Sequence, residues 1–155
     1  MLATEGTIKS ESYKLEIEKL NPGSHVTGLA CPMWVPLVEN GEYDKPGADY
    51  FVKERIDRIL QLDPQIDTII LGCTHYPLLL DKIRKYTPDG VTIVPQGKYI
   101  AESLERYLIH HDDLRRRLTT NATCRYYTTE SATKFRESAS MFLHEDIDVQ
   151  HTIIA

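Results

Sequence analysis

The sequence lacks the features that mark secreted, membrane-spanning and disulfide-stabilised proteins. It holds only three cysteines in 155 residues, an odd number at wide spacing, which argues against a disulfide framework and favours a reducing compartment. No apolar run approaches the roughly 20 residues that a membrane span needs, and the opening "MLATEGTIKS" has no signal-peptide pattern. We therefore expect a cytoplasmic chain with no membrane partner.

Positive charge is also scarce. The chain carries 18 lysines and arginines against 23 acidic residues, so its net charge of −5 offers no broad field for a phosphate backbone. The one basic cluster, Arg115 to Arg117, follows two aspartates and has no interleaved aromatic residue that would stack on bases. This cluster is typical of a solvated helical face, and we expect no nucleic-acid partner.

Metal-ligand pairs at the usual spacings are missing as well. No two cysteines or histidines stand at the spacing of a zinc site, and Cys73 with His75 would supply two ligands at most. Zinc binding is therefore the weakest interpretation of these two residues, and we predict no metal site.

What the sequence does contain is the pattern of an α/β protein. It is 41% hydrophobic and 26% charged, which is enough apolar material for a buried core. Short apolar strand candidates lie at residues 25–31, 67–72, 90–95, 123–129 and 148–154. Segments with apolar residues at helical spacing lie at residues 50–62, 77–86, 99–109 and 131–143. The alternation predicts a mainly parallel sheet with flanking helices.

Two segments disturb this simple pattern. Residues 3–7, "ATEGT", are predicted to end a strand and turn into a helix at residues 10–20, but only two residues precede them, so we expect the strand to be truncated. The polar stretch 110–121 then separates the first βα units from a last β-α-β piece. That piece is too small to bury both faces of its own sheet, and we expect it to belong to a larger structure.

The stretch "TIILGCTHYPLLL", residues 68–80, carries the strongest chemical signal. Cys73 follows an apolar strand, and catalytic groups in open α/β sheets gather at the carboxyl ends of strands. Pro77 fits the first turn of the next helix, and both a helix N-terminus and a nearby imidazolium stabilise a thiolate. His75 is close enough to form an acid/base pair with Cys73. The same two residues also fit a covalent nucleophile, or a buried cysteine beside a satisfied histidine.

A second stretch, "LACPMWVPLVENG" at residues 29–41, supplies a carboxylate. Glu39 follows a strand end and a helical turn, from where it can orient His75 and favour its protonated form. A solvated surface glutamate is the simpler alternative at this stage.

Three motifs, in this order and spacing, closely resemble the second half of the bacterial glutamate racemases. They are "LATEGTIKSESY", "ACPMWVPLVENG" and "ILGCTHYPLL", and the segment "GCTHYPLL" is the most specific. The similarity continues through "VTIVPQGKYIAESL" and "YYTTESATKFRESASMFL", so it covers essentially the whole chain. These enzymes form part of the cofactor-independent aspartate/glutamate racemase superfamily. The resemblance thus implies interconversion of L- and D-glutamate by proton transfer on opposite faces of the α-carbon, with no pyridoxal phosphate, metal or other cofactor.

The resemblance also implies roles for individual residues. The family uses two catalytic cysteines, one from each of two pseudosymmetric α/β domains that face each other across a cleft. Cys73 matches the second of them, and His75 assists it and contacts the substrate. Thr74 matches a substrate-contacting position, Glu39 matches the carboxylate that supports this side, and Thr7 lies in a loop whose threonine is placed near the substrate.

No stretch of this chain matches the first catalytic cysteine of the family. Cys31 and Cys124 do not stand at catalytic positions, and we interpret both as core residues. The resemblance implies that residues 1–95 form most of the second domain. Residues 96–155 would then be the returning segment that completes the first domain, whose N-terminal part would precede Met1.

The implied partners are glutamate as substrate, the missing N-terminal half and a second copy in a homodimer, with D-glutamate supplied to peptidoglycan. A chain with only one of the two bases is expected to be inactive by itself. Two alternatives stay open from the sequence. One is an aspartate racemase of the same superfamily, and the other is a non-catalytic remnant that acts as a binding module.

Overall fold

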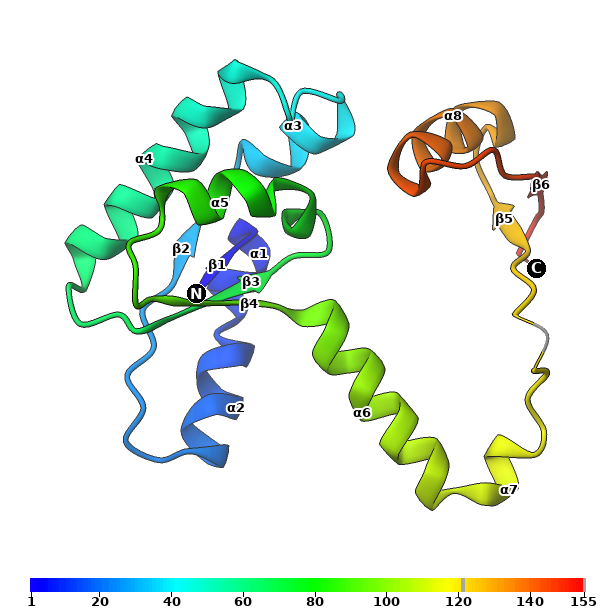
Figure 1. Ribbon diagram of the computed structural model, residues 1–155, viewed down its shortest axis with the longest axis horizontal. Helices are drawn as coiled ribbons and strands as arrows, with labels where there is room; N and C mark the ends of the chain where they lie inside the picture. The colour runs from blue at the N-terminus through cyan, green and yellow to red at the C-terminus, as the bar shows by residue number, and fades with distance from the viewer. Residues whose placement is uncertain (121, 155) are drawn as a thin grey trace. The chain divides into compact units, whose positions relative to one another are not determined.

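The computed structural model describes residues 1–120 and 122–154, and it divides into two compact units (Figure 1). The first unit spans Met1–Tyr107 and the second spans Leu108–Ala155. Each unit is described by itself. No helix within the described residues is long and apolar enough to cross a membrane.

The first unit is built on a four-stranded, wholly parallel sheet. Its strands are β1 (Leu2–Ala3), β2 (Leu29–Ala30), β3 (Thr68–Gly72) and β4 (Thr92–Pro95), in the spatial order β2-β1-β3-β4. This confirms the predicted parallel α/β sheet. The chain moves outward from β1 to β2, returns past β1 to β3, and then continues to β4, so the direction of progress reverses beside β1.

Helices fill each crossover between these strands. They are α1 (Glu5–Ser10) and α2 (Ser12–Leu20) after β1, α3 (Trp34–Glu39) and α4 (Pro46–Leu62) after β2, and the 3₁₀ helix η1 (Tyr76–Leu79) with α5 (Leu80–Tyr86) after β3. Parallel crossovers are right-handed, so α1 and α2 lie on one face of the sheet and the later helices on the other. Figure 1 shows α4 and α5 side by side, and these two helices pack together.

The core lies between the sheet and the helices of its second face. Its fully buried side chains are mostly aliphatic and come from β1, β3, α3, α4, η1 and α5: Leu2, Trp34, Val38, Val52, Ile56, Ile59, Ile69, Leu71, Tyr76, Leu79 and Ile83. The α4 members recur at three and four positions, which is the spacing of one helical face. Burial of aliphatic side chains at about 25 cal/mol per Å² is the main force that holds these layers together.

Several predicted bounds differ from the structure. The strand predicted at residues 25–31 is paired only at Leu29–Ala30, because only these residues lie opposite β1. The helix predicted at residues 10–20 is α2, and a separate helix, α1, precedes it. Thr4 caps α1, with its hydroxyl accepting from the Thr7 N–H, and Glu11 ends it in the left-handed conformation at φ 52°. The helix predicted from residue 50 begins earlier, at Pro46, where the missing N–H costs nothing.

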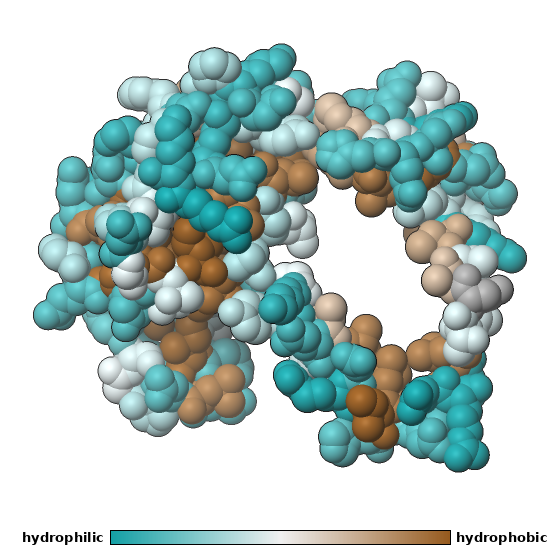
Figure 2. Space-filling view, in the orientation of Figure 1, coloured by the Kyte–Doolittle hydropathy of each residue, from teal (hydrophilic) through white to brown (hydrophobic). Residues whose placement is uncertain are grey.

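The last helix of the first unit, α6 (Gln96–His110), follows β4 directly. It has an apolar side, but none of its residues is buried. Tyr99, Ile100 and Leu104 are each at least half exposed. Figure 2 shows this apolar surface in brown along the helix.

The second unit is a small β-α-β piece. Its elements are α7 (Asp112–Arg115), β5 (Tyr126–Thr128), α8 (Ala132–Leu143) and β6 (Val149–His151), and the two strands pair in parallel. Ile147 is the one buried apolar side chain among its described residues, and Phe135 and Leu143 of α8 are exposed. Asn121, the last residue of the predicted polar stretch 110–121, lies outside the described residues.

The second unit buries little, and this contradicts the interpretation of Cys124 as a core residue. Cys124, expected in the core, is exposed, because a two-stranded sheet with one helix has no second layer to cover the segment before β5. Arg116, from the basic cluster, is 80% exposed and pairs with Asp112 at 2.6 Å. That arrangement agrees with a solvated helical face.

A polar clamp holds α4 against α5. Asp49 of α4 accepts from Lys82 at 2.5 Å, from Lys85 at 2.8 Å and from the Tyr86 hydroxyl at 2.6 Å. These three donors hold the pKa of the Asp49 carboxyl well below its usual range, and the bond to the Asp49 carboxylate in turn raises the pKa of Lys85. The side chain of Asp49 is only 22% exposed, so solvent screens the pairs incompletely.

We predict that Asp49→Asn lowers the free energy of unfolding at neutral pH and that the loss shrinks in acid. A folded-state pKa below the unfolded value of about 3.9 gives stability that is present above that pH and is lost as the carboxyl protonates on acidification. Urea unfolding at pH 7 and at about pH 3 measures the difference between parent and variant.

Asp81→Asn is the matched control, because Asp81 lies on α5 with a fully exposed side chain and an Arg84 partner at 4.0 Å. It should change stability little at either pH. A loss for Asp49→Asn that stays constant down to low pH would contradict the clamp.

Candidate active site

The predicted site residues gather at the carboxyl edge of the parallel sheet. Ala3 of β1 pairs with Gly72 of β3, so Thr4 and Cys73 are the first residues beyond two neighbouring strands. The chain reverses its direction of progress between these strands, and open α/β sheets bind ligands at such a switch point.

Gly72 is required by the close approach of β1 and β3. A Cβ atom at this position would lie 3.0 Å from the Ala3 Cβ and 3.4 Å from the Leu2 carbonyl oxygen. The glycine therefore lets the two strands pair up to their last residues. The next residue, Cys73, then leaves the sheet beside the end of β1.

Cys73 stands in a tight turn rather than in regular structure. Its carbonyl accepts the Tyr76 N–H at 3.2 Å, which turns the chain into η1. The sulfur lies 3.8 Å from the His75 Nδ1 atom, and the residue is partly exposed. The alternative of a cysteine sealed in hydrocarbon does not hold, because this thiol has both an imidazole neighbour and access to solvent.

Glu39 and His75 complete a chain of three polar groups. The His75 Nε2 atom lies 3.4 Å from a Glu39 carboxylate oxygen, while the opposite ring nitrogen faces the Cys73 sulfur. Glu39 is the last residue of α3, and α3 packs against η1, which follows His75 directly. Glu39 is 60% exposed and His75 is 33% exposed. The surface-glutamate alternative is thus correct about exposure, but the carboxylate does face the imidazole.

A buried aromatic pair joins α3, which carries Glu39, to η1, which follows His75. Trp34 of α3 and Tyr76 of η1 meet edge to face with ring centroids 4.8 Å apart, and both are fully buried. The Tyr76 hydroxyl donates to the Cys31 carbonyl at 3.3 Å, and burial raises its pKa. Such a pair contributes about 0.5–1.5 kcal/mol beyond area burial and fixes α3 relative to η1.

Cys31 lies in this support layer and not in the chain of polar groups. It is 1% exposed, and burial raises the pKa of its thiol to about 12. Its sulfur donates weakly to the Leu29 carbonyl at 3.8 Å. The interpretation of Cys31 as a core residue is confirmed.

The two predicted substrate-contacting threonines lie at the same edge of the sheet. Thr74 follows Cys73 in the turn and has an exposed side chain. Thr7 lies one turn into α1 and is partly buried, with its hydroxyl 2.9 Å from that of Thr4. Since Thr4 is next to Cys73 across the β1–β3 register, the Thr4–Thr7 pair also belongs to this edge.

The sequence analysis overlooked three residues at this edge. Thr4 follows β1 directly, and Gln96 follows β4 directly. The Gln96 amide donates to the Leu71 carbonyl at 2.7 Å and lies 2.9 Å from the Tyr13 hydroxyl. The signal that could have identified Thr4 and Gln96 is their place one residue after a strand, as for Cys73. Tyr13 carried no such signal, because its contact joins residues 83 positions apart.

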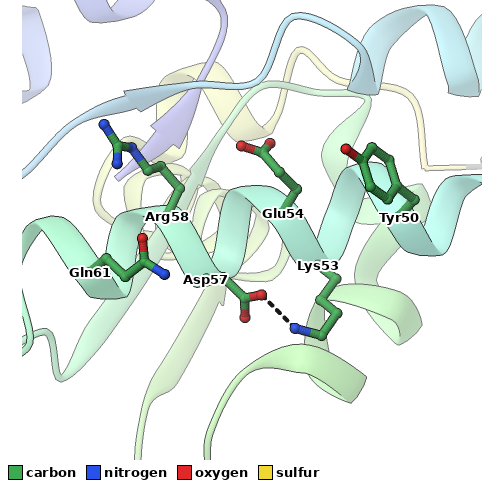
Figure 3. A pocket seen from close by; sticks show the side chains of 6 residues that line it. All are labelled: Tyr50, Lys53, Glu54, Asp57, Arg58 and Gln61. Carbon is green, nitrogen blue, oxygen red and sulfur yellow. Dashed lines mark hydrogen bonds and ion pairs between the residues drawn. The ribbon is translucent and has the colours of Figure 1, made fainter.

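One surface hollow lies elsewhere, along one side of α4 (Figure 3). It measures about 540 Å³, and all six residues that line it come from that helix: Tyr50, Lys53, Glu54, Asp57, Arg58 and Gln61. Lys53 and Asp57 pair with each other in it. It contains no predicted site residue and has the character of a solvated helix face. Among residues 1–120 and 122–154, no three His, Cys, Asp or Glu side chains are grouped to hold a metal ion.

Individual proteins with similar sequences are glutamate racemases, although no family model covers the chain. A glutamate racemase of Lactiplantibacillus plantarum is 37% identical over 152 residues, which cover 97% of this chain and 55% of that protein. A glutamate racemase of Lysinibacillus sphaericus is 37% identical over 147 residues, with 94% and 54% covered. The chain spans about half the length of the curated relatives it matches.

Solved structures agree with this similarity. The glutamate racemase isoform RacE1 of Bacillus anthracis superposes with a TM-score of 0.85 at 32% identity, over 99% of this chain and 56% of that one. The Francisella tularensis glutamate racemase, solved in complex with D-glutamate, gives a TM-score of 0.82 at 30% identity, with 99% and 56% covered. Over nearly its entire length, this chain is similar in sequence and fold to one part of these glutamate racemases.

Proposed function

We propose that this chain is the Cys73-bearing half of a glutamate racemase and corresponds to the C-terminal part of that enzyme. The observation that carries the proposal is the chain of contacts from the Cys73 sulfur through the His75 ring to the Glu39 carboxylate, placed at the switch point of a parallel sheet. The homology to glutamate racemases supports the choice of reaction.

Cys73 acts as the base on one face of the substrate. As a thiolate, it takes the α-proton of L-glutamate: the Cα–H bond breaks, an S–H bond forms, and the electron pair stays on the α-carbon. An acid on the opposite face then delivers a proton to that carbon, which gives D-glutamate. In the reverse direction, the Cys73 thiol returns its proton to the α-carbon.

His75 and Glu39 tune this proton carrier. A protonated imidazole 3.8 Å from the sulfur favours the thiolate, and the carboxylate 3.4 Å from the far ring nitrogen favours the protonated imidazole. The two contacts use opposite ring nitrogens, so the ring is held in one orientation. Cys73 is thereby prepared as the base before the substrate arrives.

The hydroxyls at the same edge bind the substrate. Thr74, Thr7 and the His75 imidazole offer hydrogen-bond donors to the carboxylates of glutamate, and the threonine hydroxyl oxygens can accept from its ammonium group. The α-proton of an amino acid is much less acidic than a thiol, so placed hydrogen bonds must stabilise the carbanion-like transition state. The reaction proposed here needs no cofactor, because the proton moves between side chains and the α-carbon.

The second base must come from outside the first unit. Cys31 is buried and burial raises the pKa of its thiol to about 12, so it stays protonated near neutral pH and offers no thiolate, and Cys73 is the other cysteine of that unit. We infer that the remaining half of the racemase supplies the opposing cysteine. It would also supply the rest of the first racemase domain, which is a different body from the first unit described above. Residues 1–95 would be most of the second domain, and residues 96–155 the segment that completes the first.

The wider setting follows from the same proposal. The complete enzyme would be a homodimer of the bacterial cytoplasm that supplies D-glutamate for peptidoglycan. The exposed apolar side chains of α6 and α8 are suited to packing against the remaining half, because such surface is costly to leave in water.

We predict that the purified 155-residue chain alone has negligible racemase activity, because it carries one of the two bases. Exchange of the α-proton with deuterated solvent, followed by NMR from both L- and D-glutamate, measures this directly. Racemisation in both directions by the chain alone would contradict the assignment. Aspartate, tested in parallel with an active assembled enzyme, distinguishes a glutamate racemase from an aspartate racemase.

In an active chimera with the remaining half of the Lactiplantibacillus plantarum enzyme, Cys73→Ala should abolish racemisation. The reason is that the Cys73 sulfur is the group proposed to take the α-proton. Circular dichroism of D-glutamate formation provides the rate. Cys124→Ala is the matched control and should leave the rate unchanged; near-normal turnover by Cys73→Ala would remove Cys73 from its role.

In the same chimera, Glu39→Gln should lower the racemisation rate about tenfold, on the scale of one lost charge-assisted interaction. The amide keeps the shape of the side chain but no longer favours a protonated His75. Glu42→Gln serves as the control, because Glu42 pairs with Lys45 at the surface, 2.7 Å away. Equal effects of the two substitutions would show that Glu39 acts only as a surface charge.

A further inference from the structure

Gln96 occupies an unusual place in the β3–β4 ladder. The Thr92 N–H donates to the Asp67 carbonyl, and successive bonds in a parallel ladder lie two residues apart. The position that would bond the Leu71 carbonyl is therefore residue 96, where the chain has already turned into α6. The Gln96 side-chain amide donates to that carbonyl instead, at 2.7 Å.

The same side-chain amide also contacts α2, one of the two helices in the β1–β2 crossover. The Tyr13 hydroxyl donates to the Gln96 Oε1 atom at 3.0 Å. Tyr13 belongs to α2, which follows β1, and both side chains are partly buried. A single side chain thus connects the first residue of α6, the end of β3 and the helix pair behind β1.

We propose that Gln96 is a positioning residue for Cys73. This inference rests on the proposed function and deepens it by naming what holds the reactive turn in place. Leu71 is 1% exposed, so its carbonyl would lack solvent as a replacement partner if the amide were removed. The strand would then loosen at its last residues, which are Gly72 and the turn that carries the Cys73 sulfur toward His75.

The bond lies at the very end of the β3–β4 ladder. The register from Thr68 to Leu71 is complete without it, and Gln96 contributes no buried apolar surface. Its contact falls two residues before Cys73, at the point where the ladder ends and the functional turn begins. The bond is therefore placed to fix the distance between the sulfur and the imidazole.

The test measures how strongly His75 activates the Cys73 thiol, and it needs no racemase activity. In the full 155-residue chain with Cys124→Ser, Cys73 is the accessible thiol, because Cys31 is buried with its pKa raised to about 12. Iodoacetamide alkylation of Cys73 is followed by mass spectrometry between about pH 5 and pH 9, since the thiolate is the species that reacts.

The titratable neighbours of the reactive turn must be considered in this profile. His75 faces the sulfur, Glu39 of α3 faces His75, and Tyr76 of η1 and Cys31 lie in the layer beneath. Both of the latter have pKa values raised by burial, so they stay protonated throughout the range. The contribution of His75 to the profile is therefore identified by comparison with the His75→Ala variant.

The decisive comparison is a double-mutant cycle between Gln96→Leu and His75→Ala. If Gln96 positions Cys73 against the imidazole, Gln96→Leu should slow alkylation near pH 6.5 about fivefold, the scale of one buried hydrogen bond, but only while His75 is present. In the His75→Ala background, the same substitution should have no further effect. Equal fold-changes in both backgrounds, or no change in either, would overturn the proposal.

Two further variants keep the result interpretable. Gln96→Glu keeps the size and the acceptor for Tyr13 but removes the donor to Leu71, so it must reproduce the Gln96→Leu pattern, and it decides the question if Gln96→Leu does not fold. Tyr13→Phe removes only the outer hydrogen bond and should stay within about twofold of the parent. An effect of Tyr13→Phe as large as that of Gln96→Leu would assign the role to α2 rather than to the Leu71 contact.

Failure of this test and failure of the proposed function are distinguishable. A cycle without interaction leaves Cys73 free to act as a racemase base, whereas an active chimera with Cys73→Ala would remove that role whatever the cycle shows.

Discussion

The close pairing of β1 with β3 is the constraint on which the site depends. These two strands meet at Ala3 and Gly72, where a Cβ atom would lie only 3.0 Å from the Ala3 Cβ, so glycine suits the close approach. Because the pairing extends to the last residues of both strands, Thr4 and Cys73 emerge side by side. From β1 the chain adds β2 on one side and later β3 on the other. The crossovers therefore lie on opposite faces of the sheet, and the carboxyl edge between β1 and β3 is left open.

The three cysteines show how position decides the chemistry of one residue type. Cys31 and Cys73 each follow a strand of the same sheet, yet the first is sealed beneath Trp34 and Tyr76 while the second reaches solvent beside an imidazole. Burial raises the pKa of the Cys31 thiol to about 12 and so favours its neutral form. Cys124 lies exposed in the second unit, which has too few layers to cover it.

Burial is uneven along the chain. The first unit has a complete layer of aliphatic side chains between its sheet and α4, whereas α6 and α8 bury none of their residues. Apolar helix faces of this kind are stable when another layer covers them. The relatives of this chain are almost twice as long, so there is enough further sequence in them to supply such a layer.

The sequence by itself determined the parallel α/β class and the place of Cys73 at a strand end, whereas the residues expected around it came largely from the resemblance. Alternating apolar strands and helical spacing carry that information locally. It could not determine that Cys124 is exposed, or that Gln96 reaches Leu71 and Tyr13. Only the tertiary structure decided these points, because they depend on pairings between residues far apart in the chain, which no local pattern encodes.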